Sequence, residues 1–324
     1  MLSKIESINK INYLSTKSTP FLFIIDFDMG KNIVLSQSEL QGEEICFSII
    51  NFAEYNNFHL RKKQFQFSKH PLTFNEYSKA FSLIQEEISA GNSYLVNLTF
   101  PTEIKTDLSL LDIFQMSEAK FKLFFRNEFV VFSPEPFIEI HDNVISSFPM
   151  KGTIDAEIEN AEQIILEDEK EKAEHTTIVD LIRNDLSIVA KNVFVEKFRY
   201  IEKINTNQKN ILQVSSKISG ELPKEYKKHL GNIIYKLLPA GSISGAPKRK
   251  TVEIIKNVEK VSRGFFTGIF GYFDGNNLQS AVMIRFIERK NDTLFFRSGG
   301  GITFMSDVNS EYQELIDKVY VPIY

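Results

Sequence analysis

Apolar and polar residues recur along this chain at two periods, which predict strands and helices in different stretches. Residues 20–50, "PFLFIIDFDMGKNIVLSQSELQGEEICFSII", combine β-branched and aromatic runs with turn residues, which predicts strands. Residues 93–100, 121–148, 278–288 and 293–298 show the same pattern. Strands are therefore expected early, in the middle and late in the chain.

Helical spacing marks the stretches between these strands. Residues 75–90 carry apolar positions at helical spacing and are followed by Gly91, which favours a helix end. Residues 156–190 are also helical in pattern, and a glycine turn at 299–301 is expected to precede a final helix. Because distant strands must share sheets, this order predicts one large α/β unit rather than two independent domains.

Composition excludes several classes of protein. The 324 residues are 43% hydrophobic and 25% charged, which is ordinary for a globular protein. A formal net charge of -4 gives no electrostatic support for a nucleic-acid partner, and the single Cys46 excludes a disulfide framework within the chain. No signal peptide and no apolar run of membrane-spanning length is recognised, so we expect a cytoplasmic protein without membrane contact.

Two stretches concentrate carboxylates at helical spacing. Their charged positions are Glu167, Glu171 and Glu174 in "ILEDEKEKAEHTTIVDLIRNDL", and Glu311, Glu314 and Lys318 in "SDVNSEYQELIDKV". Asp307 is the expected N-cap of the second helix. Two such faces that meet in a cleft would suit Mg²⁺, which prefers oxygen ligands. Two solvated helix faces are the alternative, which the pattern alone favours.

Two glycine-containing segments are candidate anion sites. "LLPAGSISGAPKRK", residues 237–250, encloses two serines in a tight turn before a helix, where exposed N–H groups could hold an anionic ligand. An ordinary loop-to-helix junction explains it equally well. In "RSGGGI", residues 297–302, three glycines would let backbone amides approach a carboxylate, although a turn or bulge is the simpler explanation.

A lysine and a glutamate are the candidate reactive pair. Lys151 lies in "PMKGT" and Glu135 in "SPEPF", at the end of the preceding strand run. If the two segments form adjacent strands, both side chains reach one cleft. A lysine becomes nucleophilic when it loses solvent or lies near other cations, and a buried carboxyl can act as a general acid. Without further information, two surface charges are the simpler interpretation.

Taken together, these segments resemble the chorismate-utilising enzymes, a family that includes anthranilate synthase component I, aminodeoxychorismate synthase component I, and isochorismate and salicylate synthases. The resemblance covers about residues 75–320 in the family's order. The matching text is "GNSYLVNL", "SPEPF", "PMKGT", "AEHTTIVDLIRNDL", "PAGSISGAPK", "RGFFTGIFGY", "AVMIRF" and "GGGITFMSDVNSEYQELIDK".

The resemblance implies a two-sheet β-sandwich with helices on the outside and the active site between the sheets. It implies one catalytic domain, 1–324, in which residues 1–70 are a shortened strand region that completes the sandwich. It also implies that Mg²⁺ is held by Glu174 and Glu314, supported by Glu171 and Glu311. The implied substrate-binding residues are Ser244, Tyr272, Arg285, Gly300, Gly301 and Lys318, with Lys248 a weaker candidate.

Within this family, the position of Lys151 separates activities. The text "PMKGT" is similar to the P-I-K-G-T of aminodeoxychorismate synthases, whereas anthranilate synthases carry Ala at this position. The resemblance implies that Lys151 attacks C2 of chorismate while Glu135 assists departure of the C4 hydroxyl. Ammonia then adds at C4, which gives 4-amino-4-deoxychorismate for p-aminobenzoate and folate biosynthesis.

Other activities and partners stay open. The alternatives are anthranilate synthesis, isochorismate or salicylate synthesis with Lys151 as a base that activates water, and a non-catalytic chorismate-binding subunit. Gln213 replaces a frequent His, and Asn92 and Leu95 depart from the family's Gly-Asp-x-Tyr-Gln. No match to the tryptophan-binding region of longer relatives and no Cys-His glutaminase signature is recognised. Ammonia is therefore expected from a glutamine amidotransferase partner, and release of p-aminobenzoate from another enzyme.

Overall fold

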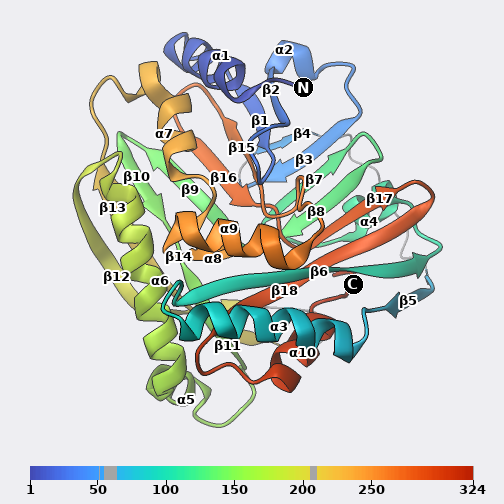
Figure 1. The fold of residues 1–324 in the computed structure, drawn as a ribbon. Helices are drawn as coiled ribbons and strands as arrows, with labels where there is room; N and C mark the ends of the chain where they lie inside the picture. Colours follow the sequence, from blue (N-terminus) through green and yellow to red (C-terminus); the bar gives the residue numbers. More distant parts are fainter. Residues whose placement is uncertain (51, 55–63, 205–209, 324) are drawn as a thin grey trace.

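Two antiparallel sheets form the centre of the computed structural model, which describes residues 1–50, 52–54, 64–204 and 210–323 (Figure 1). Sheet A runs in the order β11 (Met150–Asp155), β13 (Ile211–Glu221), β10 (Val144–Ser147), β9 (Pro136–His141), β16 (Leu278–Val282), β15 (Ile269–Phe273), β1 (Phe21–Ile25) and β2 (Asn32–Ser36), with β12 (Lys191–Ile204) paired to β13. Sheet B runs in the order β14 (Gly245–Ala246), β6 (Leu95–Thr106), β18 (Thr293–Thr303), β17 (Phe286–Lys290), β8 (Phe129–Ser133), β7 (Phe121–Phe125), β3 (Ile45–Ile49) and β4 (Phe52–Glu54), with β5 (Phe67–His70) paired to β6.

Helices cover the outer faces of the two sheets. Sheet A packs against α1 (Lys4–Thr16), α6 (Glu169–Ser187) and α7 (Leu230–Leu237). Sheet B packs against α3 (Phe74–Ser89), α4 (Leu110–Met116), α9 (Lys248–Glu259) and α10 (Val308–Asp317). The shorter helices are α2 (Gln37–Leu40), α5 (Ala161–Glu167), η1 (Tyr226–His229) and α8 (Gly241–Ser244). The expected two-sheet sandwich with outer helices is confirmed.

Burial on both faces explains why several strands are uninterrupted apolar runs. Along β1, Phe21 and Phe23 pack into the core beneath the helices of sheet A. Leu22 and Ile24 point the other way, into the core between the sheets. An antiparallel strand with one solvated face would alternate apolar and polar residues, whereas a strand between two packed layers needs apolar residues at every position.

Strands from the start of the chain belong to both sheets. In sheet A, β1 pairs with β15 from the last quarter of the chain. In sheet B, β3 pairs with β7 and β5 pairs with β6. Of the expected strand region 1–70, residues 51 and 55–63 lie outside the described residues.

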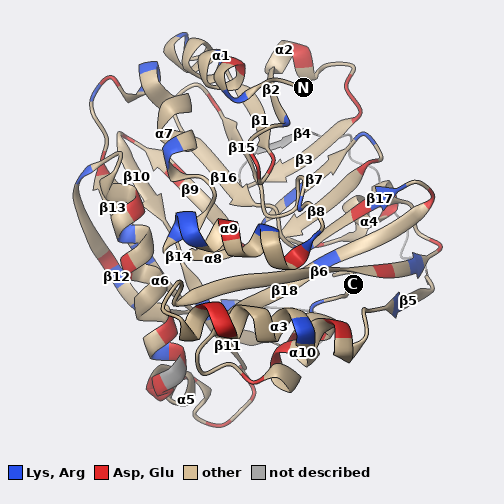
Figure 2. Ribbon diagram, in the orientation of Figure 1, with Lys and Arg blue, Asp and Glu red and all other residues tan. Residues whose placement is uncertain are grey.

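The helix expected over 156–190 is two helices. Asp168 caps the second of them, since its Oδ1 accepts a 2.8 Å hydrogen bond from the backbone N–H of Glu171. Acidic positions gather along α5 and the start of α6 (Figure 2). Glu167 is the last residue of α5, so the expectation that it shares a helix face with Glu171 and Glu174 is wrong.

The glycine triplet lies inside a strand rather than in a turn, which corrects the expected glycine turn. Gly299 and Gly301 pair with Thr99 and Asn97 of β6, and the turn comes after Thr303. A Cβ on Gly299 would lie 2.2 Å from the carbonyl oxygen of Leu98. Glycine is needed here because the strands approach too closely for a side chain.

The strand expected over 278–288 is also interrupted. β16 ends at Val282 in sheet A, and β17 begins at Phe286 in sheet B, so residues 283–285 cross between the sheets. Arg285 has a φ of 52° at this crossing, a left-handed conformation that is uncommon for a residue with a side chain.

No helix of the described residues is long and apolar enough to span a membrane.

Candidate active site

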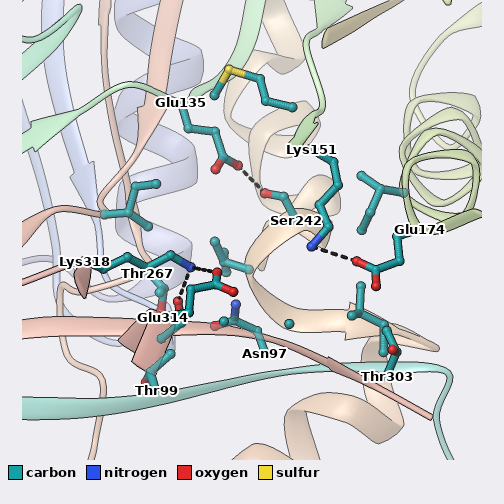
Figure 3. Close-up of a pocket in the computed structure, with 18 of the residues that line it drawn as sticks. Asn97, Thr99, Glu135, Lys151, Glu174, Ser242, Thr267, Thr303, Glu314 and Lys318 are labelled. Atoms are coloured by element: carbon teal, nitrogen blue, oxygen red, sulfur yellow. Dashed lines mark hydrogen bonds and ion pairs between the residues drawn. The ribbon is translucent and has the colours of Figure 1, made fainter. Parts of the chain in front are cut away.

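A cavity of about 410 Å³ lies where β6 and β18 of sheet B face β11 of sheet A. Side chains from α6, α8 and α10 complete its walls (Figure 3). Its charged lining residues are Glu135, Lys151, Glu174, Arg285, Arg297, Glu314 and Lys318. All seven belong to the segments that the sequence singled out, so the fold brings distant motifs to one place.

Lys151 forms an ion pair with a carboxylate inside this cavity. Its Nζ lies 2.7 Å from Oε2 of Glu174, which is near the start of α6 (Figure 3). The side chain of Glu174 is only 13% exposed, and that of Lys151 is 33% exposed. Lys151 is therefore held at the cavity wall and is not a surface charge.

The carboxylates around Lys151 favour its protonated form. Burial is the largest single influence and lowers the pKa of Lys151. The charges of Glu174, Glu171 and Glu314, with the hydrogen bond to Glu174, outweigh burial and raise this pKa above its ordinary value. The structure thus holds Lys151 as an ammonium group, and a nucleophilic role requires that it lose a proton.

Glu135 enters the same cavity without a charged hydrogen-bond partner among the described residues. Its Oε1 accepts a short hydrogen bond from the hydroxyl of Ser242 (Figure 3). Burial raises the pKa of Glu135, while the bond from Ser242 and the charge of Lys318 lower it less strongly. A carboxyl group that keeps its proton is suited to act as a general acid.

The strands that carry Lys151 and Glu135 are not neighbours, which corrects the sequence-based expectation. β13 and β10 lie between β11 and β9 in sheet A. Both residues still line the cavity. Glu135 directly precedes β9 and Lys151 is the second residue of β11, so both lie at strand starts that open onto the same space.

Two further cations lie near one another on another wall. Lys318 caps α10, and its Nζ is 2.5 Å from Oε1 of Glu314 and donates a 2.8 Å hydrogen bond to the carbonyl of Gly299. Arg285 donates to the carbonyl of Lys318 over 3.4 Å. With the backbone of Gly300 and Gly301, which also line the cavity, these cations could receive a carboxylate ligand.

Two of the expected substrate-binding side chains lie elsewhere. Ser244 is fully buried, and its hydroxyl donates a 2.9 Å hydrogen bond to the carbonyl of Ala240 within the turn of α8. The hydroxyl of Tyr272 donates to Oε1 of Gln37 over 2.8 Å, in the core between the sheets. Neither side chain is among the residues that line the cavity.

Lys248 is also outside the cavity lining. Its Nζ lies 2.7 Å from Oδ2 of Asp185 and donates a 2.9 Å hydrogen bond to the carbonyl of Leu237. The structure therefore does not place Lys248, the weaker candidate, with the expected substrate-binding residues that line the cavity. Lys248 ties the start of α9 to α6 and to the end of α7.

The four glutamates expected to hold Mg²⁺ come from two helices on different walls. Glu174 and Glu314 line the cavity. Oε2 of Glu171 lies 3.0 Å from the position that a Cβ on Gly152 would take, and Oε2 of Glu311 lies 3.2 Å from that position on Gly300. These glycines leave room for carboxylates beside the cavity backbone, and oxygen donors of this kind are the ligands that Mg²⁺ prefers.

The carboxylates do not form one cluster in this conformation. No three acidic, histidine or cysteine side chains of the described residues come close enough together to hold a metal ion. Glu174 and Glu314 are instead paired with Lys151 and Lys318. Binding of Mg²⁺ by Glu174 and Glu314 would therefore require these two ion pairs to open.

The residues that depart from the family's motifs have separate environments. Asn92 donates a 2.7 Å hydrogen bond to Glu87 on the surface, and Leu95 lines the cavity. Gln213 pairs with Thr153 of β11 and Glu202 of β12, away from the cavity lining.

Sequence reasoning missed several short polar side chains in the cavity. They are Asn97, Thr99, Thr177, Ser242, Thr267 and Thr303. All but Thr99 belong to motifs quoted above, but an uncharged residue inside a motif gives no signal about which way it points. For Ser242, its position in the same turn as Ser244 was the available clue.

Comparison with known proteins identifies close and distant relatives. The family model described as chorismate binding enzyme matches residues 34–323. The "Uncharacterized PabA-like protein" of Haemophilus influenzae is 49% identical over 98% of this chain and 96% of its own length. Aminodeoxychorismate synthase component 1 of Bacillus subtilis is 30% identical, with 77% of this chain and 55% of the relative covered. Anthranilate synthase component 1 of Mycobacterium bovis is 31% identical, with 76% and 51% covered.

Solved structures agree on the fold. Anthranilate synthase component I of Streptococcus pneumoniae is 25% identical with a TM-score of 0.67, covering 79% of this chain and 59% of that one. The menaquinone-specific isochorismate synthase of Escherichia coli is 14% identical with a TM-score of 0.72, covering 98% and 81%. The chain spans about half the length of the two synthase components matched by sequence. Because it is 31% identical to one and 30% identical to the other, sequence identity does not distinguish between their two activities.

Proposed function

The chain belongs to the chorismate binding enzyme family, and from this premise we propose that it aminates chorismate at C4, as an aminodeoxychorismate synthase component I. The observation that carries the proposal is the presence of Lys151 inside the cavity together with Glu135. Identity to the anthranilate synthase relatives is equally high, so the choice rests on this lysine.

The proposed reaction uses two displacements. The neutral amine of Lys151 attacks C2 of chorismate, both ring double bonds shift (C1=C2 to C1=C6, and C5=C6 to C4=C5), and the C4–O bond breaks as Glu135 gives its proton to the departing hydroxyl, which leaves as water. Ammonia then attacks C4, both double bonds shift back, and the C2–N bond breaks to release Lys151. The proton lost by the added ammonia restores Glu135, so the net exchange is ammonia for water.

The remaining charged groups would bind and orient the substrate. Chorismate carries two carboxylates, and Arg285, Lys318 and the backbone of Gly300 and Gly301 offer cations and N–H groups on one wall. Glu174 and Glu314, with Glu171 and Glu311 behind them, would hold Mg²⁺. When bound, the ion supplies positive charge for a substrate carboxylate and competes for the carboxylates that keep Lys151 protonated.

Ammonia would come from a glutamine amidotransferase subunit. A relative named as component 1 of a synthase supports a second component for this chain as well. Free ammonium at high concentration is expected to replace it less efficiently.

Product identification tests this function. The full chain is incubated with chorismate, Mg²⁺ and ammonium, and the product is identified by mass spectrometry and NMR. An amine at C4 supports the proposal, while an amine or a hydroxyl at C2 reassigns the enzyme to anthranilate-type or isochorismate-type chemistry. No conversion, even with glutamine and an amidotransferase subunit added, indicates a non-catalytic chorismate-binding subunit.

A further inference from the structure

We infer that Ser242 is a positioning residue for Glu135: its hydroxyl holds the carboxyl group in the cavity in the orientation needed for proton transfer. This inference rests on the proposed role of Glu135 as the acid. It concerns how that acid is held, which neither the motifs nor the relatives specify.

The first observation is the contact itself. The hydroxyl of Ser242 donates a short hydrogen bond to Oε1 of Glu135, and both residues line the cavity. No other hydrogen bond reaches this carboxyl group from the described residues, whereas the backbone N–H of Glu135 donates to Ser133 over 3.1 Å. Ser242 therefore determines where the carboxyl group points.

The second observation is that the helix carrying Ser242 is fixed from behind by a buried ion pair. Nη1 of Arg263 donates a 2.9 Å hydrogen bond to the carbonyl of Ile243, the residue after Ser242. Nε of Arg263 donates to Oε2 of Glu259 over 2.9 Å, and both side chains are almost fully buried, at 1% and 4% exposure. Because this ion pair is buried and hydrogen-bonded, the backbone beside Ser242 is fixed before the reaction begins. The Ser242 hydroxyl therefore needs little free energy of reorganisation during proton transfer.

The same ion pair also holds the part of the cavity lining that β6 forms. Nη2 of Arg263 donates a 2.7 Å hydrogen bond to the carbonyl of Asn97, and Oε1 of Glu259 accepts bonds of 2.9 and 3.0 Å from the N–H and hydroxyl of Thr99. Asn97 and Thr99 line the cavity on β6. Ser242 is thus fixed relative to the wall where the substrate would lie.

The hydrogen bond also affects the charge state of Glu135. The bond from Ser242 stabilises the carboxylate form, and it partly offsets the raised pKa that burial causes. The other charged groups that line the cavity are Lys151, Glu174, Arg285, Arg297, Glu314 and Lys318. Of these, the charge of Lys318 lowers the pKa of Glu135. Loss of the Ser242 hydroxyl is therefore expected to raise that pKa.

A matched set of serine variants tests the inference. Ser242→Ala removes the hydrogen bond to Glu135, and Ser242→Thr keeps a hydroxyl at the same position. Ser244→Ala is the control: it removes a hydroxyl from the same short helix, but that hydroxyl donates to the carbonyl of Ala240 and not to Glu135. For Ser242→Ala we expect kcat to fall about tenfold or more, with KM little changed. The alkaline limb of the pH–rate profile should move to higher pH, because Glu135 then stays protonated up to a higher pH.

A second readout does not need turnover. The carboxyl resonance of Glu135 is followed by ¹³C NMR as pH is varied, and it is assigned with Glu135→Gln. We expect its midpoint to rise by about one pH unit in Ser242→Ala, the loss of one hydrogen bond to a charged group. The midpoint should return toward the original value in Ser242→Thr and stay unmoved in Ser244→Ala.

The results separate this inference from the proposed function. An unmoved midpoint in Ser242→Ala, an equal shift in Ser244→Ala, or no restoration by Ser242→Thr overturns the inference. A product other than the C4 amine overturns the proposed function, while the titration of Glu135 still reports on its contact with Ser242.

Discussion

Nζ of Lys151 lies 2.7 Å from Oε2 of Glu174, so the residue proposed to form the covalent intermediate is paired with a residue proposed to bind the metal ion. The contact joins β11 of sheet A to α6. A lysine held by carboxylates is a poor nucleophile, because the ammonium form has no free electron pair. A cation bound to Glu174 would compete with Lys151 for this carboxylate and would thereby favour release of the Lys151 proton.

Replacement of Lys151 tests the covalent route. Lys151→Ala is expected to lower C4 amination by at least about 10³-fold, because the nucleophile is removed. Chorismate binding, measured by calorimetry, should stay within a few-fold, since Arg285 and Lys318 are intact. Lys197→Ala, at an exposed position on β12, is the control. Unchanged C4 amination in Lys151→Ala contradicts the covalent route.

Metal binding is expected to depend on carboxylates from both helices. Calorimetric titration with Mg²⁺ should show binding to the unmodified chain, weakened at least about tenfold in Glu174→Gln and in Glu314→Gln. Glu169→Gln removes an exposed carboxylate from the same helix as Glu174 and should bind normally. Equal binding by all three variants would place the ion elsewhere.

Arg285 is expected to contribute mainly to substrate binding. Arg285→Gln removes a charged hydrogen-bond donor worth about 1.5–3 kcal/mol, which corresponds to a rise in KM of roughly 10- to 150-fold with a smaller change in kcat. Arg289→Gln, at an exposed arginine on β17, serves as the control. A fall in kcat with unchanged KM in Arg285→Gln contradicts a role in binding.

The close approach of β18 to β6 makes Gly299 sensitive to substitution. A methyl group there would lie 2.2 Å from the Leu98 carbonyl oxygen, so Gly299→Ala should lower the free energy of unfolding by about 3 kcal/mol or more. A methyl group on Gly30 would have no atom within 4 Å, and Gly30→Ala should change stability by no more than about 0.5 kcal/mol. Urea denaturation of both variants measures the difference, and equal stabilities refute the close-packing explanation.

The ion pair between Arg263 and Glu259 should be important for stability. Arg263→Ala leaves a buried carboxylate without its cation, so a loss of about 3–5 kcal/mol in the free energy of unfolding is expected. Arg183 forms an exposed ion pair with Asp180, and Arg183→Ala should cost less than about 1 kcal/mol. Denaturation curves that coincide for the two variants would show that the buried pair is not needed.

The spacing of apolar residues along the sequence predicted most of the helices and strands, because the period of each depends on residues that are close together in the chain. The helix that ends before Gly91 is confirmed, with Thr73 as its N-cap and a φ of 75° at Gly91. The expected N-cap Asp307 is confirmed by its bond to the N–H of Ser310. Pattern failed where the surroundings decide, as in the glycine triplet, which is a strand because β6 lies against it.

The sequence by itself determined which residues carry charge and in which motifs they occur, and it thereby pointed to Lys151, Glu135, Glu174 and Glu314. Only the tertiary structure decided their partners. It turned Ser242 rather than Ser244 into the cavity, placed Tyr272 in the core, and paired Lys151 with Glu174. The physical reason is that the local pattern says which residues share a face of a helix or strand, whereas packing against segments far away in the chain decides which face meets the cavity.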